Sequence, residues 1–149
     1  MKRIALLLLL LSGLSLAACA PRAPDPERFA EKFFEHGKKS ILHAMKDQEV
    51  SESQLASARG VLDRYQPDAQ REIASVVRAQ QALMLALSSG GDSATLLKLE
   101  AGQNQVQNQA LRTIGRMHEE LASAVGPEKW QGTSAKLEKK HGRYFKPRE

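Results

Sequence analysis

Apolar residues recur in steps of three and four along two long stretches of the chain, and these two stretches predict the main elements of the fold. The first stretch carries Leu55, Ala58, Leu62, Tyr65, Ala69, Ile73, Val76, Leu83 and Leu87, with only Gln80 interrupting. The second carries Leu96, Leu99, Val106, Ala110, Ile114, Met117, Leu121 and Val125. Such spacing places apolar side chains on one face of a helix. Residues 88–92 (SSGGD) separate the stretches, so we expect an antiparallel helical hairpin from Val50 to Val125.

Helix-start signals mark both outer ends of this hairpin. At the first, Ser51 and Gln54 have the spacing of a capping box, and Val50 precedes it as the outer half of a hydrophobic staple. At the second, Gly126 takes the cap position, Pro127 the first helical position and Glu128 the first turn. We therefore expect a helix to begin at each of these segments.

Two shorter helices are predicted to flank the hairpin. Asp25 and Pro26 suit the start of a first helix that runs to about Lys46, and the last helix runs from Pro127 to about residue 141. Within the hairpin, Pro67 removes a backbone amide, but the apolar spacing continues across it. We expect one kinked helix there; the alternative is a fresh helix that begins at Pro67.

The fold class is accordingly all-α, with a helical domain over residues 27–141. The hairpin helices are too long to bury their apolar faces within one hairpin and two short helices. We therefore expect an antiparallel homodimer.

The first 18 residues have the pattern of an export signal. Lys2 and Arg3 precede an apolar run that is too short to span a bilayer, which takes about 20 residues. The run ends in LAAC, which resembles the lipobox of bacterial lipoproteins, so Cys19 is the predicted lipid-attachment site. Residues 19–26 then form a Pro-rich tether. The expected location is the periplasmic side of the outer membrane, because Ala20, and not an aspartate, follows the cysteine.

Composition excludes several classes of protein. Cys19 is the only cysteine, so the exported domain has neither a disulfide nor a thiolate metal site. Residues 128–149 hold 7 basic and 3 acidic side chains, and within them residues 142–149 are read as a basic disordered tail. Because the basic residues are not interleaved with aromatic ones, nucleic acid is not an expected partner. We find no phosphate loop and no nucleophile motif, so an enzyme is not expected either.

The hypothesis of a metal site rests on histidines, with Glu35 or Asp47 as possible oxygen donors. The weak candidates are His36, His43 and His118. His36 and His43 stand two helical turns apart, so their rings lie on one side of the helix but about 10 Å apart. One ion does not bridge that distance, whereas a chelating pair in a helix has a spacing of four residues. We expect no metal and no other cofactor.

An uncharged surface rich in amide side chains is the candidate site for protein partners. The segment 103–109 (QNQVQNQ) is uncharged and has one apolar residue. Flexible apolar side chains nearby, together with arginines that attract acidic segments, suit varied partners. The proposed partner-binding residues are Met84, Val106, Arg112, Arg116 and Met117.

The two helix-start segments, residues 50–54 (VSESQ) and 125–129 (VGPEK), resemble the repeated Leu-Thr-x-x-Gln motif of the Spy/CpxP family of periplasmic proteins. The first copy is conservative at each marked position, and the second keeps the Pro-Glu often found between them. The resemblance implies an all-α antiparallel dimer that acts as an ATP-independent chaperone or as a stress adaptor on sensor kinases. It also links the chain to a heavy-metal-sensing branch.

The sequence thus predicts a lipid-anchored periplasmic binding protein with unfolded or envelope-stress proteins as partners. Two alternatives remain open. One is a periplasmic sensor or resistance protein for zinc, nickel or copper, and the other is a structural lipoprotein without chaperone activity.

Overall fold

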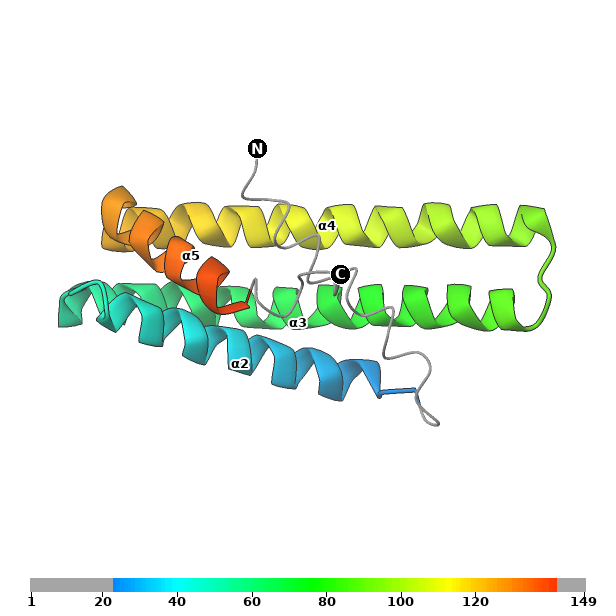
Figure 1. Ribbon diagram of the computed structural model, residues 1–149, viewed down its shortest axis with the longest axis horizontal. Coiled ribbons are helices and arrows are strands. Elements are labelled where there is room, and N and C mark those ends of the chain that lie inside the picture. The colour runs from blue at the N-terminus through cyan, green and yellow to red at the C-terminus, as the bar shows by residue number, and fades with distance from the viewer. Residues whose placement is uncertain (1–22, 142–149) are drawn as a thin grey trace.

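The computed structural model describes residues 23–141, and within this range every regular element is an α-helix. The helices are α2 (Pro26–Lys46), α3 (Glu52–Ser88), α4 (Ser93–Val125) and α5 (Pro127–His141). As Figure 1 shows, α3 and α4 run antiparallel as a long hairpin, α2 lies along α3, and α5 lies across the end where α4 finishes. The predicted all-α class, the hairpin and both flanking helices are therefore confirmed.

The predicted capping box is present at the start of α3. The Gln54 amide donates to Ser51 Oγ at 3.3 Å, and the Ser51 amide donates to Gln54 Oε1 at 3.2 Å. Val50 and Leu55 are both buried in the same apolar cluster, as a hydrophobic staple requires. Local side-chain chemistry thus fixes where the longest helix begins.

The other helix ends also follow local chemistry. The Asp25 carboxylate accepts from the Arg28 amide at 2.8 Å, with Pro26 in the first turn. Asp92 is the cap of α4 and accepts from the Thr95 amide at 3.0 Å. Gly126 ends α4 with a φ of 91°. Glycine adopts this conformation readily, whereas any residue with a side chain would be strained in it.

The two motif segments meet in space, although about 75 residues separate them. Gln54 Nε2 donates to the Val125 carbonyl at 3.0 Å, and Lys129 Nζ donates to the Glu49 carbonyl at 2.8 Å. The α2–α3 connection is thereby joined to the α4–α5 connection, at the end of the hairpin opposite its turn.

Helix α3 runs unbroken through Pro67, so the alternative of a fresh helix at that residue is wrong. The apolar face on both sides of Pro67 is buried, with Leu62 and Ala69 in one cluster. Burial of this face compensates for the backbone hydrogen bond that the proline cannot make. A bend at Pro67 stays a prediction.

The main core lies at the end of the molecule where all four helices meet. Its fully buried members come from α2, α3 and α4 and include Met45, Leu62 and Leu121. Trp130 of α5 and Val125 of α4 close the cluster. We call residues 26–77 and 110–141 the proximal bundle.

The predicted apolar stripes are only partly buried, which corrects the sequence interpretation at the turn end of the hairpin. Val76 is fully buried, but Leu83 is half-buried and Leu87 is 53% exposed. Leu96, Leu99 and Val106, on the facing helix, are also only half-buried. Their periodicity is helical, yet no helix of the described chain covers them.

Helix lengths explain this difference. Helix α3 has 37 residues and α2 has 21, so at about 1.5 Å per residue α3 is longer by about 24 Å. The start of α2 lies against the last third of α3, where Gln81 Nε2 donates to the Pro24 carbonyl at 2.8 Å and Arg78 pairs with Glu27. Beyond this point, within residues 23–141, α3 and α4 pack only against each other.

Candidate functional site

The turn end of the hairpin is the first candidate site. We call residues 78–109 the distal arm; it comprises the last turns of α3, the connection and the first half of α4. None of these residues is buried. Leu85, Leu87 and Leu97 are 70%, 53% and 66% exposed, and all three exposed large apolar residues of the described chain thus lie in the distal arm. The distal arm thus presents leucine side chains to solvent.

Electrostatic contacts are nearly absent from the distal arm. Its charged residues are Arg78, Asp92, Lys98 and Glu100. The last cross-link between α3 and α4 is at its base, where Gln109 Nε2 donates to Glu72 Oε1 at 3.3 Å. Beyond it, no side-chain hydrogen bond or ion pair joins the two helices in the part of the chain that the structure describes. Weak apolar packing alone holds the two helices together here.

The predicted partner-binding residues divide between the two regions. Met84 and Val106 are half-buried in the distal arm, and Val106 packs against Val76 and Ala110. Arg112 and Arg116 are exposed on α4 just beyond the arm. Met117 is 6% exposed and belongs to the main core, so it is not part of an exposed partner surface. This corrects the expectation that Met117 binds partners. The apolar spacing had also placed Met117 on the core-facing stripe, and the structure agrees with that placement.

Sequence reasoning missed Leu85 and Leu97. Both lie off the predicted core stripe, so they had no assigned partner. The signal was present, because residues 79–91 contain three leucines, one methionine and no charge.

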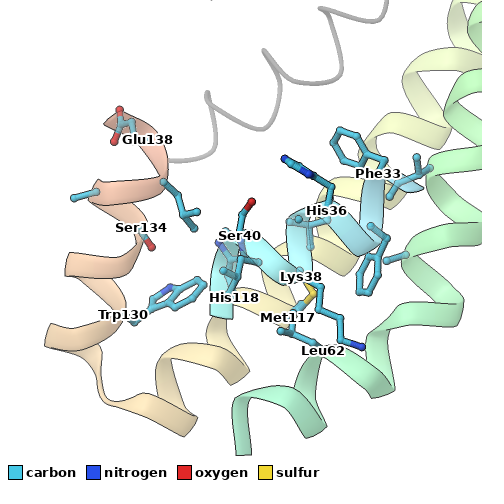
Figure 2. A pocket seen from close by; sticks show the side chains of 18 of the residues that line it. Phe33, His36, Lys38, Ser40, Leu62, Met117, His118, Trp130, Ser134 and Glu138 are labelled. Atoms are coloured by element: carbon cyan, nitrogen blue, oxygen red, sulfur yellow. The ribbon is translucent and has the colours of Figure 1, made fainter. Parts of the chain in front are cut away.

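A cavity in the proximal bundle is the second candidate site. It has a volume of about 470 Å³ and lies between α2, α5 and the hairpin. Figure 2 shows α5 with Trp130, Ser134 and Glu138 on one side, and α2 with Phe33, His36 and Ser40 on the other. The apolar walls are formed by Phe33, Phe34, Ile41, Leu62, Ala69, Ile73, Ile114, Met117, Trp130, Ala135 and Leu137.

His118 is a partly buried polar group in the cavity lining. Its ring packs edge-on against Trp130, with centroids 5.1 Å apart at 78°. Burial lowers the pKa of His118, which favours the neutral imidazole. Among residues 23–141, the ring has no hydrogen-bond partner.

The histidine candidates for a metal site do not form one cluster. His36 and His118 both contribute to the cavity lining, whereas His43 lies elsewhere, with Nε2 3.8 Å from Asp47 Oδ2. Within residues 23–141, no group of three or more His, Cys, Asp or Glu side chains is arranged to hold an ion.

A polar cluster ties α3 to α4 in the proximal bundle. Glu120 accepts from Tyr65 Oη and from Arg64 Nη2, both at 2.6 Å. The hydrogen bond from Tyr65, then that from Arg64, lowers the pKa of Glu120, and the same contact raises the pKa of Tyr65. These contacts join α3 to α4, and the exposed ion pair between Arg64 and Glu120 contributes little to stability.

The predicted export signal, Cys19 and the basic tail lie outside the described residues. None of the helices between residues 23 and 141 combines the length and apolar character that crossing a membrane requires. No protein-family model, curated protein or solved structure matches the chain. The functional interpretation therefore rests on the residues themselves.

Proposed function

We propose that this protein is an exported, lipid-anchored helical binding protein that holds unfolded or stress-damaged proteins on its distal arm without ATP. Cys19 is the proposed anchor, which places the arm on the periplasmic side of the outer membrane. The observation that carries the proposal is the exposure of Leu85, Leu87 and Leu97 in the distal arm, whose residues 78–109 include no buried residue. Exposed apolar surface of this kind is typical of a surface that another protein covers.

The composition of the distal arm suits many partners better than one. Leucines and Met84 supply adaptable apolar contacts, and the amide side chains of residues 103–109 donate and accept hydrogen bonds without imposing a charge. Because the arm has few charges, it neither selects nor repels a partner strongly by electrostatics. Arg112 and Arg116, exposed beside it, add attraction for acidic segments.

Release without ATP requires weak, distributed contacts in place of one deep pocket. The distal arm meets this requirement, since its exposed leucines are spread over two helices. A second copy of the chain is the proposed partner in the resting state, with its own arm against this one. The dimer and the client then compete for the same leucines.

Suppression of aggregation tests the proposal. A triple variant with Leu85→Ser, Leu87→Ser and Leu97→Ser removes the exposed leucines, and we expect it to lose most of the wild-type suppression measured by light scattering. The matched control replaces three exposed alanines of the same arm with serine, namely Ala82, Ala94 and Ala101. It adds the same hydroxyl groups while leaving the leucines in place, so it should keep the activity.

Two outcomes would contradict the proposal. In one, the wild-type protein suppresses no aggregation of an unfolding model protein at several-fold molar excess. In the other, the leucine variant stays folded by circular dichroism and is as active as the alanine control. The second result would move the binding surface away from the distal arm.

A further inference from the structure

The cavity in the proximal bundle is too large to be an ordinary packing defect. Close-packed protein interiors contain few voids larger than a water molecule. The cavity volume of about 470 Å³ lies instead within the range of about 300–1,000 Å³ typical of small-molecule sites. It also combines apolar walls with a few polar groups, which is the usual composition of such sites.

Gly37 helps to create this space. Phe34, Gly37 and Ile41 follow one another in steps of three and four, so they share the face of α2 that turns toward the bundle. A Cβ atom placed on Gly37 meets no other atom within 4 Å. The position where a core side chain would project is therefore empty, although glycine lowers helix stability by about 1 kcal/mol relative to alanine.

The polar groups of the cavity indicate what part of a ligand they would bind. The His118 ring has no hydrogen-bond partner among the described residues. Because burial lowers its pKa, the ring is neutral near pH 7 and offers one donor and one acceptor nitrogen. A ligand hydroxyl, which both donates and accepts, complements such a ring, and the hydroxyls of Ser40 and Ser134 lie in the same lining.

The charges at the cavity argue against an anionic ligand. Lys38 is already paired with Asp63 of α3 at 2.5 Å. Glu138 of α5 adds a negative charge to the lining. A carboxylate or phosphate would therefore find repulsion there without a cation dedicated to it.

We propose that this cavity binds an uncharged amphiphile, whose apolar chain lies among the side chains of the proximal bundle and whose hydroxyl bonds to His118. The site stands at the opposite end of the hairpin from the distal arm, so it is independent of the proposed client binding. A long-chain alcohol is the simplest probe of this chemistry.

Trp130 reports directly on the site, because it is the only tryptophan of the chain and packs against His118. The full chain, bound to phosphatidylcholine vesicles at one fixed lipid concentration, is titrated with dodecanol while Trp130 emission is recorded. We expect a saturable change with dodecanol and at least about tenfold weaker apparent binding of dodecanoate. No saturable change, or equal binding of the carboxylate, would overturn the proposal.

Gly37→Leu blocks the cavity without an expected loss of folding, because leucine is a better helix former than glycine. We expect the apparent affinity for dodecanol to fall at least about tenfold. Gly102→Leu is the matched control: it is the same substitution, also in open space, on an exposed position of the distal arm. It should leave the affinity unchanged, and equal losses in the two variants would contradict the assignment.

His118→Phe separates the hydrogen bond from the space. Phenylalanine keeps an aromatic ring that packs against Trp130, but it has no ring nitrogen, so the hydrogen bond to the ligand is lost. We expect dodecanol to bind about three- to tenfold more weakly, as for one lost hydrogen bond. Unchanged affinity would remove His118 from the site. The aggregation assay should be unaffected by Gly37→Leu, so a failure of this proposal is distinguishable from a failure of the proposed function.

Discussion

The proximal bundle and the distal arm are built from the same two helices with the same apolar spacing, yet only the first has a core. Val76 is fully buried, whereas Leu83, two turns further along the same face, is half-buried and Leu87 is 53% exposed. The difference is the number of neighbouring helices: α2 and α5 cover the bundle, and the start of α2 reaches only the base of the arm, at Arg78 and Gln81. Helical periodicity thus predicts which face of a helix is apolar, but it does not predict whether another helix of the chain covers that face.

The two regions also differ in polar contacts. The ion pairs of the described residues lie in the proximal bundle or, for Arg78 and Glu27, at its boundary with the arm. Such exposed pairs each contribute little to stability, about 0–1 kcal/mol. The distal arm lacks both the core and these contacts, so it should open at a lower free energy than the bundle.

The largest expected difference between the two regions is the effect of a leucine-to-alanine substitution on the free energy of unfolding. Leu62→Ala in the bundle should lower the free energy of unfolding by about 2–5 kcal/mol, because it leaves a hole in a fully buried site. In the monomer, which low protein concentration favours, Leu97→Ala in the distal arm should change it by less than about 0.5 kcal/mol, because that side chain is 66% exposed in the single chain. Urea unfolding of the two variants measures both values.

An equally large loss for Leu97→Ala would mean that something covers the distal arm. Repeating the measurement over a range of protein concentrations identifies the cover. A concentration-dependent midpoint assigns it to a second copy of the chain, as proposed for the resting dimer.

Local chemistry made the helix ends predictable. Ser51 with Gln54, Asp25 with Pro26, and Gly126 with Pro127 each act within one turn, so the sequence alone contained the information. Helix bounds in the structure agree with those expectations at both motif segments. The apolar faces near the core, such as those of Leu62 and Leu121, followed from periodicity for the same reason.

The remaining features depend on distances between helices, which periodicity does not contain. The exposure of Leu87 follows from where α2 begins along α3, and the burial of His118 follows from how α5 crosses α4. The cavity includes the open space beside Gly37, and only the packed bundle shows that this space is enclosed by neighbouring helices. The Spy/CpxP resemblance and the dimer stay predictions.

Two caps of the same kind offer a finer comparison. Ser51→Ala removes the side-chain acceptor at the start of α3, inside the proximal bundle, and should lower the free energy of unfolding by about 1 kcal/mol in urea. Asp92→Ala removes the equivalent acceptor for the Thr95 amide, in the distal arm. There we expect faster amide hydrogen exchange in the first turn of α4 and a smaller change in the global midpoint.

Ser57→Ala is the control for the first cap. Ser57 is exposed within α3, and its hydroxyl donates to the Ser53 carbonyl at 3.1 Å, a contact that does not stabilise a helix end. This variant should keep or slightly raise stability. If Asp92→Ala lowered the global midpoint as much as Ser51→Ala, the arm and the bundle would unfold as one unit, contrary to the comparison.

The smallest expected effect is a loss of stability in mild acid that is confined to the proximal bundle. The pKa of His118 is lowered by burial from the ordinary value of 6.5, so the unfolded state takes up this proton first as the pH falls. The contribution of His118 is fully present above the unfolded pKa of about 6.5 and is lost as the pH falls toward the lower folded pKa. Hydrogen bonds from Tyr65 and Lys136 lower the pKa of Glu120 and of Asp47, so those carboxylates take up protons only in stronger acid.

Urea midpoints between about pH 7.5 and pH 5 should therefore fall with pH for the wild type, and His118→Phe should flatten the slope. The distal arm contains no histidine, which is the side chain that changes its charge in this window. Hydrogen exchange in the arm, corrected for the intrinsic effect of pH, should thus be unchanged while exchange in the bundle rises. A slope that survives His118→Phe would assign the acid sensitivity to another group.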